Sequence, residues 1–218
     1  MIRTMLTLCA CLAAGAAATA TMLVAGCADL HSNQVASQTY VLTAAPASPA
    51  PVGAATAIAL TGGAAPAGVT VQVLRPLAAP GLDTDQIALL RDAQRLDYYA
   101  ASRWPAALPD LLQTLAVDAL RAAGRFRAVQ PDATAFAADD VLQIEIRHCE
   151  VVYAPDGTPT AHVQLLATLG HQGDRSLVSS VTAASEVPAA ANRMQSVVAA
   201  FQDAVSRSLT QLAAGLTP

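Results

Sequence analysis

Hydrophobic and polar positions alternate with a period of two in the second half of the chain, as expected for half-buried strands. The alternation is most regular over 161–169, and the longer segment 141–153 precedes it. Asp156 and Gly157 separate the two segments and form a strong hairpin signal, and a third strand is expected over 176–185. The pattern predicts a three-stranded meander. Apolar residues occupy the even-numbered positions up to Ile146 and the odd-numbered positions from Cys149 onward. This change near His148 and Cys149 predicts a β-bulge or twist there.

Shorter strands are predicted in the first half of the chain. Residues 69–73 alternate, and segments 86–91 and 95–100 are expected to form a hairpin. An early strand is expected over Tyr40 to Leu42, and another short one over 126–130. Together with the meander, these segments predict a mostly antiparallel sheet.

Two stretches have the apolar spacing of amphipathic helices. Apolar residues recur at helical intervals from Leu108 to Leu120, with Pro105 suited to the first helical position and Gly124 to the C-terminal cap. Pro109 must then lie in the first turn, or the predicted start is misplaced. A second helix is predicted over 189–214. The order of elements predicts an α+β fold, in which both helices pack on one face of the sheet.

The first 26 residues have the layout of a secretory signal peptide. Arg3 is followed by an uncharged apolar run that ends in Leu23 to Cys27, which resembles the bacterial lipobox. This resemblance implies cleavage before Cys27 and its lipidation, including long acyl chains such as palmitate. Three other interpretations remain: an uncleaved transmembrane anchor, an ordinary signal peptide cut after Ala20, or a soluble alanine-rich helix.

The predicted organisation has three parts. Residues 1–26 are the signal peptide, 27–39 a polar tether, and 40–218 a single domain with a flexible Ala/Pro/Gly-rich loop over 44–68. The lipobox resemblance implies a diacylglyceryl group on the Cys27 thiol and a third acyl chain on the new N-terminus, which would hold the protein on its membrane essentially permanently. Ala28 follows the cysteine where aspartate would favour inner-membrane retention. We therefore expect the periplasmic face of the outer membrane, with the inner membrane as the alternative.

Composition narrows the classes of function. The net charge is −4 and all 12 basic residues are arginine, without the clustered positive charge of a nucleic-acid-binding domain. Charged residues are too few and apolar residues too many for a disordered chain. Cys149 would be the one unmodified cysteine after processing, so we expect it to be buried and to form no internal disulfide.

Catalytic and metal-binding motifs are absent from the sequence. His148 and His162 lie on neighbouring predicted strands, but no carboxylate or third histidine is spaced to complete a metal site, so ordinary core or surface histidines are favoured. For Trp104, core packing is the first interpretation and contact with a partner or lipid the second. We expect a protein that is not an enzyme and that needs no cofactor or metal.

Residues 80–108 carry a family resemblance. The Leu82 and Asp83 turn, Tyr98 and Tyr99, and Trp104 before a leucine-rich helix resemble the ABC-type transport auxiliary lipoprotein family. The Tyr40 to Leu42 segment and the lipobox fit the same family, which includes lipoproteins of paraquat-inducible, MCE-type intermembrane transport systems. The likeness extends over most of residues 40–215.

The resemblance implies a non-catalytic periplasmic subunit of a lipid transport system. Its partners would be an MCE-domain protein and, through it, the ABC permease and ATPase. Leu82, Asp83, Tyr98, Tyr99 and Trp104 are the candidate contact residues, because tyrosine and tryptophan are favoured interface anchors. Homo-oligomerisation is compatible with this role, and nucleic acid is not an expected partner. The alternatives are a structural outer-membrane lipoprotein that stabilises another envelope assembly, or a lipoprotein that binds a small ligand.

Overall fold

The computed structural model describes residues 36–44, 68–91 and 94–217. Residues from Ser37 onward form one unit. The predicted signal peptide, Cys27 and most of the predicted loop at 44–68 lie outside the described residues, so the domain boundaries stay predictions.

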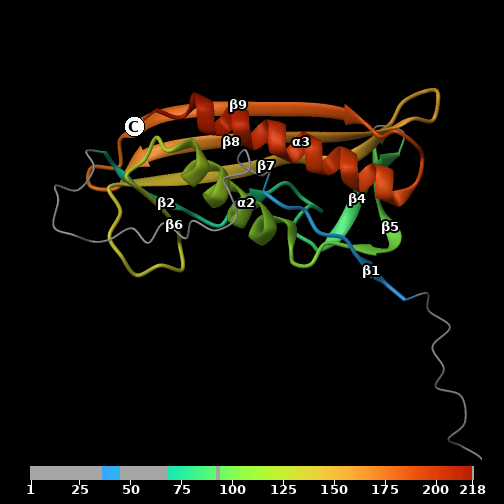
Figure 1. Ribbon diagram of the computed structural model, residues 1–218, viewed down its shortest axis with the longest axis horizontal. Helices are drawn as coiled ribbons and strands as arrows, with labels where there is room; N and C mark the ends of the chain where they lie inside the picture. Colours follow the sequence, from blue (N-terminus) through green and yellow to red (C-terminus); the bar gives the residue numbers. More distant parts are fainter. Residues whose placement is uncertain (1–35, 45–67, 92–93, 218) are drawn as a thin grey trace, which may run out of the picture. The chain divides into compact units, whose positions relative to one another are not determined.

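The longest strand, β7, organises the sheet. β7 (Asp140–Tyr153) pairs along its full length with the antiparallel β8 (Pro159–His171), which pairs in turn with β9 (Leu177–Pro188). This arrangement confirms the predicted meander (Figure 1). Gly157 takes the positive φ of +83° that its turn requires, a conformation that glycine adopts without steric cost.

Three short strands share the other edge of β7. β2 (Thr70–Val73), β3 (Leu77–Ala78) and β4 (Gln86–Arg91) each pair with β7 in parallel. The prediction of a mostly antiparallel sheet is therefore wrong in this part, because the sheet is mixed. Alternation identifies the buried face of a strand but not its neighbour or its direction. A two-residue strand such as β3 also leaves no periodic signal.

The remaining strands extend the sheet at its margins. β5 (Arg95–Arg103) is antiparallel to β4, β1 (Gln38–Thr39) is parallel to β5, and β6 (Ala128–Pro131) is parallel to β2. The first strand thus lies just before the predicted segment 40–42. Tyr40 continues the pairing by one bond only, since its backbone N–H donates to the carbonyl of Arg103 at 2.8 Å.

A β-bulge interrupts the pairing of β7 with β8. Ile146 lies opposite Leu165, whereas His148 lies opposite Gln164, so Arg147 is an extra residue on β7. The bulge keeps the residues before and after it on the same buried face: Ile146 is fully buried, and Cys149 is 3% exposed. The predicted bulge is confirmed. The bulge lets the apolar residues of β7 change from even-numbered to odd-numbered positions while they remain on the buried face.

Helix α2 (Leu108–Ala123) begins later than Pro105. Pro109 lies at its N-terminal positions, where the missing backbone N–H costs no helical hydrogen bond. Gly124 ends the helix in the left-handed conformation, with φ of +63° and its N–H donating to the carbonyl of Arg121 at 3.1 Å. The predicted C-terminal cap is confirmed, and the predicted start is corrected to Leu108.

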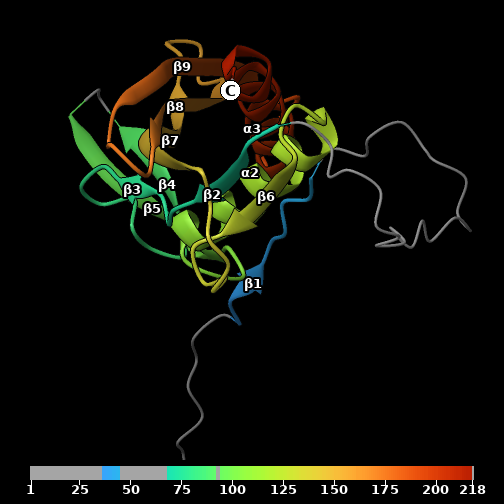
Figure 2. The same ribbon diagram turned by 90° about the vertical axis from the view of Figure 1, so that its left-hand side faces the viewer.

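Helix α3 (Met194–Gly215) also begins later than predicted, because bends occupy the residues between β9 and Met194. The sheet curves, and both helices lie next to each other on one side of it (Figure 2). The predicted α+β class, with two helices packed on the sheet, is confirmed. Among the helices that the structure describes, none combines the length and hydropathy needed to cross a bilayer.

Candidate functional site

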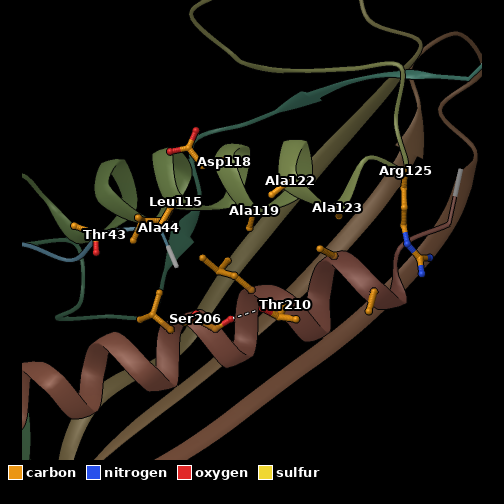
Figure 3. Close-up of a pocket in the computed structure, with 14 residues that line it drawn as sticks. Thr43, Ala44, Leu115, Asp118, Ala119, Ala122, Ala123, Arg125, Ser206 and Thr210 are labelled. Atoms are coloured by element: carbon orange, nitrogen blue, oxygen red, sulfur yellow. Dashed lines mark hydrogen bonds between the residues drawn. The ribbon is translucent and has the colours of Figure 1, made fainter. Parts of the chain in front are cut away.

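An elongated groove runs between α2 and α3. Its volume is about 400 Å³. Figure 3 shows side chains from both helices directed into the space between them. The lining consists of Thr43, Ala44, Leu115, Asp118, Ala119, Ala122, Ala123, Arg125, Val205, Ser206, Leu209, Thr210, Ala213 and Ala214.

Small side chains open this groove. α2 presents Ala119, Ala122 and Ala123, and α3 presents Ala213 and Ala214. Positions three or four residues apart lie on one helix face, so Ala119, Ala122 and Ala123 form a strip with little side-chain volume along α2. Leu115, Val205 and Leu209 add larger apolar side chains, and the polar or charged lining residues are Thr43, Asp118, Arg125, Ser206 and Thr210. The chemistry that this surface offers is therefore the burial of an apolar group.

The segment before residue 45 forms a third wall. The backbone N–H of Thr43 donates to Gln202 Oε1 at 2.8 Å, and Gln202 Nε2 donates back to the carbonyl of Thr43 at 2.7 Å. Leu42, one residue earlier, is 3% exposed. These contacts hold Thr43 and Ala44 beside α3, where both line the groove.

Polar and charged side chains form a minority of the lining of the groove. Asp118 on α2 and Arg125 beyond its end contribute one charge of each sign. Arg125 Nη1 donates to the carbonyl of Leu216 at 3.4 Å. Thr210 Oγ1 donates to the carbonyl of Ser206 within α3, at 2.8 Å (Figure 3). An occupant would therefore meet a mostly apolar surface that carries one acidic and one basic side chain.

The sequence prediction placed the contact surface elsewhere. Leu82 and Trp104 are 3% and 2% exposed, so their side chains have almost no surface to offer a partner. Trp104 packs edge-on against Phe201 of α3, with ring centroids 5.5 Å apart. For Leu82 and Trp104, the structure replaces the interface prediction with a core role, which was the first interpretation for Trp104.

The two predicted interface tyrosines point to different neighbours. The Tyr98 hydroxyl donates to the carbonyl of Gly81 at 2.8 Å, which ties β5 to the turn before β4. The Tyr99 hydroxyl lies 3.0 Å from that of Tyr153. Burial, assisted by this hydrogen bond, raises the pKa of Tyr99. Both tyrosines are half-buried, so a partner contact at Tyr98 and Tyr99 stays a prediction.

Asp83, the remaining predicted contact residue, belongs to an exposed ion-pair network. Arg75 Nη2 lies 2.8 Å from Asp83 Oδ1, and Arg75 Nε lies 2.7 Å from Asp110 Oδ1. The arginine thus links the segment after β2, the turn before β4 and the first turn of α2. Its hydrogen bonds hold the pKa of Asp83 below the ordinary value. A contact role for Asp83 also stays a prediction.

The histidine prediction needs correction. Glu150 lies two residues after His148 on β7 and directly opposite His162 on β8, and the three side chains form one cluster. The expectation that no carboxylate accompanies the two histidines is wrong, because residues i and i+2 of a strand share a face. Cys149 is buried in the opposite face as predicted, and burial raises the pKa of its thiol.

Comparison with known proteins gives a family match. A family model for the ABC-type transport auxiliary lipoprotein component matches residues 40–213. No curated protein matches at a comparable level of significance.

Solved structures share the fold. A DUF330-family protein of Xanthomonas campestris is 28% identical with a TM-score of 0.62, and the alignment covers 68% of this chain and 85% of that protein. A further, uncharacterized protein is 14% identical with a TM-score of 0.55, covering 66% and 90% of the two chains. The family match extends over most of the chain and agrees with the resemblance in the sequence. The chain therefore belongs to the ABC-type transport auxiliary lipoprotein component family.

Proposed function

We propose that this protein is a non-catalytic lipoprotein subunit of an MCE-type lipid transport system, anchored at the periplasmic face of the outer membrane. The family match over residues 40–213 carries the proposal, because it makes an auxiliary component of ABC-type transport the coarse role of the chain. The sequence from Leu23 to Cys27 supports an acyl anchor, and Ala28 favours the outer membrane.

An anchored auxiliary subunit acts through the surfaces that it presents. Residues 28–36, which precede the folded unit, would reach roughly 30 Å if fully extended, which lets the domain meet a partner away from the lipid headgroups. The described residues offer the α2–α3 groove as a preformed apolar surface. We assign this groove to an apolar segment of the MCE partner, since binding in a groove between helices is a common mode of peptide recognition.

The alanine strip favours a protein segment in this position. Ala119, Ala122 and Ala123 allow close backbone approach, which a packed helix or extended segment can use along its length. Asp118 and Arg125 in the lining can fix the direction of a segment that carries complementary charges. This placement differs from the predicted patch around Tyr98 and Tyr99, and the two surfaces can be tested separately.

The decisive experiment is capture of an MCE-domain protein from the same organism, chosen by its gene neighbourhood. Ala122→Trp places a large side chain in the groove from an exposed position, so folding is retained while the groove is filled. We expect its affinity for the MCE protein to fall at least tenfold, which corresponds to about 1.4 kcal/mol. Gln211→Trp is the matched control, because Gln211 is exposed on α3 and does not line the groove.

Other outcomes would assign the role differently. If wild-type protein captures no MCE protein, and the gene neighbourhood contains no MCE protein or permease, the MCE assignment is wrong. If Ala122→Trp leaves capture intact but removes lipid that co-purifies with wild type, the groove binds lipid instead of a partner segment. If only Tyr98→Ala or Tyr99→Ala weakens capture, the contact lies on the β5 side.

A further inference from the structure

The bulge in β7 brings three chemically related side chains to one place. Without the bulge, regular alternation would place His148, two residues after the buried Ile146, on the same face and pointing into the core. With it, His148 shares the outer face with Glu150 and lies diagonally across from His162 on β8. The two imidazole rings stack with centroids 4.5 Å apart.

Glu150 is unusually enclosed for a carboxylate on this face. Its side chain is 6% exposed, whereas those of His148 and His162 are 44% and 22% exposed. Oε2 accepts the backbone N–H of Cys149 at 2.7 Å. Oε1 lies 2.7 Å from His148 Nδ1 and 3.4 Å from His162 Nδ1. A buried negative charge is energetically costly unless it is paired. A positive charge between the two imidazole rings would therefore stabilise the Glu150 carboxylate.

A second carboxylate–histidine pair lies on the same two strands, and there a protonated histidine provides the positive charge beside the buried carboxylate. Asp140 is 4% exposed in its side chain, and its Oδ1 lies 2.8 Å from His171 Nδ1. The hydrogen bond to Asp140 raises the pKa of His171, which favours the protonated ring. Glu150 differs because two imidazoles, instead of one, face the same carboxylate oxygen.

We propose that His148, Glu150 and His162 bind a divalent transition-metal ion of the zinc class. Two imidazole nitrogens and one carboxylate oxygen form a zinc ligand set that leaves a fourth position open. The potential ligand atoms all lie within 4.8 Å of one another. This inference is independent of the proposed transport role, because it concerns the outer face of β7 and β8 and not the helix groove.

The distances agree with such a site after a small movement. Ligand atoms around a tetrahedral zinc ion are about 3.4 Å apart, given metal–ligand bonds of about 2.1 Å. His162 Nδ1 already lies 3.4 Å from Glu150 Oε1. The His148 contact must lengthen by roughly 0.7 Å. This ring must also turn out of the stack, which its 44% exposure allows.

Glu186 on β9 completes the surroundings of the site. It lies directly opposite His162, and its Oε1 is 3.9 Å from His162 Nε2. A histidine that binds a metal through one nitrogen usually donates its other N–H to a carboxylate or carbonyl. Glu186 is therefore placed to orient His162, and the ion would link β7 to β8 with support from β9.

The test uses the full-length protein in detergent, purified with an affinity tag that contains no histidine. Zinc chloride is titrated by calorimetry, and cobalt chloride by the visible absorption of tetrahedral Co²⁺. We expect one ion per chain and a higher melting temperature with zinc, because an ion that binds only the folded state stabilises it. Binding should weaken as the pH falls, since the imidazoles must be deprotonated.

The variants locate the ion. His148→Gln and His162→Gln should each weaken zinc binding at least tenfold, and Glu150→Gln should do the same if it folds. His171→Gln is the matched control and should change the affinity less than twofold. The proposal is overturned if wild type shows no saturable binding or if His148→Gln and His162→Gln bind zinc normally. It also fails if His31→Gln or His171→Gln abolishes the binding.

Discussion

Trp104 shows at the residue scale how burial separates a core role from a contact role. Its side chain is 2% exposed and packs edge-on against Phe201, which is fully buried. We expect Trp104→Ala to lower the free energy of unfolding by about 3–5 kcal/mol, because the substitution leaves a cavity where β5, α2 and α3 meet. Chemical denaturation monitored by circular dichroism measures this loss.

Phe136 provides the comparison for Trp104. It is 77% exposed, so Phe136→Ala should change stability by no more than about 0.5 kcal/mol. If Trp104→Ala melts like wild type and instead weakens capture of a partner, the core role assigned to Trp104 is wrong.

A second prediction at the residue scale concerns how the contribution of Asp83 to stability depends on pH. Hydrogen bonding to Arg75 lowers the pKa of Asp83 in the folded state below its ordinary value of 3.8. A lowered carboxyl pKa contributes stability above the unfolded-state pKa, and this contribution is lost as the pH falls through the folded-state pKa. Asp83→Asn should therefore be less stable than wild type at pH 7, with a difference that shrinks toward pH 2.

Urea unfolding of wild type and Asp83→Asn at pH 7, 4 and 2 checks this sign. The pair is solvent-exposed, so the difference at pH 7 should be small and should decrease in 1 M salt. A difference that stays constant across the pH range would mean that Asp83 acts through packing or turn geometry instead of its charge.

The bulge in β7 gives a prediction at the scale of the element. Deleting Arg147 restores regular alternation, because Ile146 and Cys149 keep their inward direction and His148 keeps its outward one. We expect this deletion to leave a cooperative, moderately destabilised fold. Deleting Glu145 turns Ile146 outward and shifts the strand against the bulge, so we expect loss of cooperative melting.

Thermal melts monitored by circular dichroism compare the two deletions. Both remove one partly or fully exposed charged residue from the same strand, so chain length stays matched while the net charge changes by one in opposite directions. Equal destabilisation by the two deletions would contradict the parity argument.

The elements differ in how far the sequence could predict them. β7, β8 and α2 were predictable because their apolar residues repeat at the period of the element over many positions. The short parallel strands on the other edge of β7 were not, because their pairing depends on contacts between distant segments. β3 has two residues, and β1 precedes the segment that carries the early apolar signal.

The candidate sites were hidden for related reasons. The groove combines Ala119 with Ala213, which lie far apart in the sequence, and alanine is so common in this chain that its strip carried no signal. The spacing of His148 and Glu150 could have revealed their shared face. Glu150 and His162, however, become opposite neighbours only through the register of β7 and β8.

At the scale of the whole molecule, the proposed role depends on the anchor as much as on the folded domain. Cys27 would carry the acyl chains, and the residues between it and the folded unit would set the distance between the membrane and the groove. An affinity that is modest in solution becomes effective when both partners are confined to the same space, because tethering raises their effective concentration. Membrane location is therefore part of the functional proposal and needs its own test.

Ala28 offers that test. If aspartate after the lipidated cysteine retains a lipoprotein on the inner membrane, Ala28→Asp should move this protein from the outer-membrane to the inner-membrane fraction without changing its fold. Sucrose-gradient fractionation followed by immunoblotting measures the change. Asp29→Asn is the control for the neighbouring charge and should leave the location unchanged. Cys27→Ser should leave an unprocessed chain that lacks the acyl anchor. Wild-type protein in the inner-membrane fraction would contradict the outer-membrane proposal directly, while leaving the family and the fold unaffected.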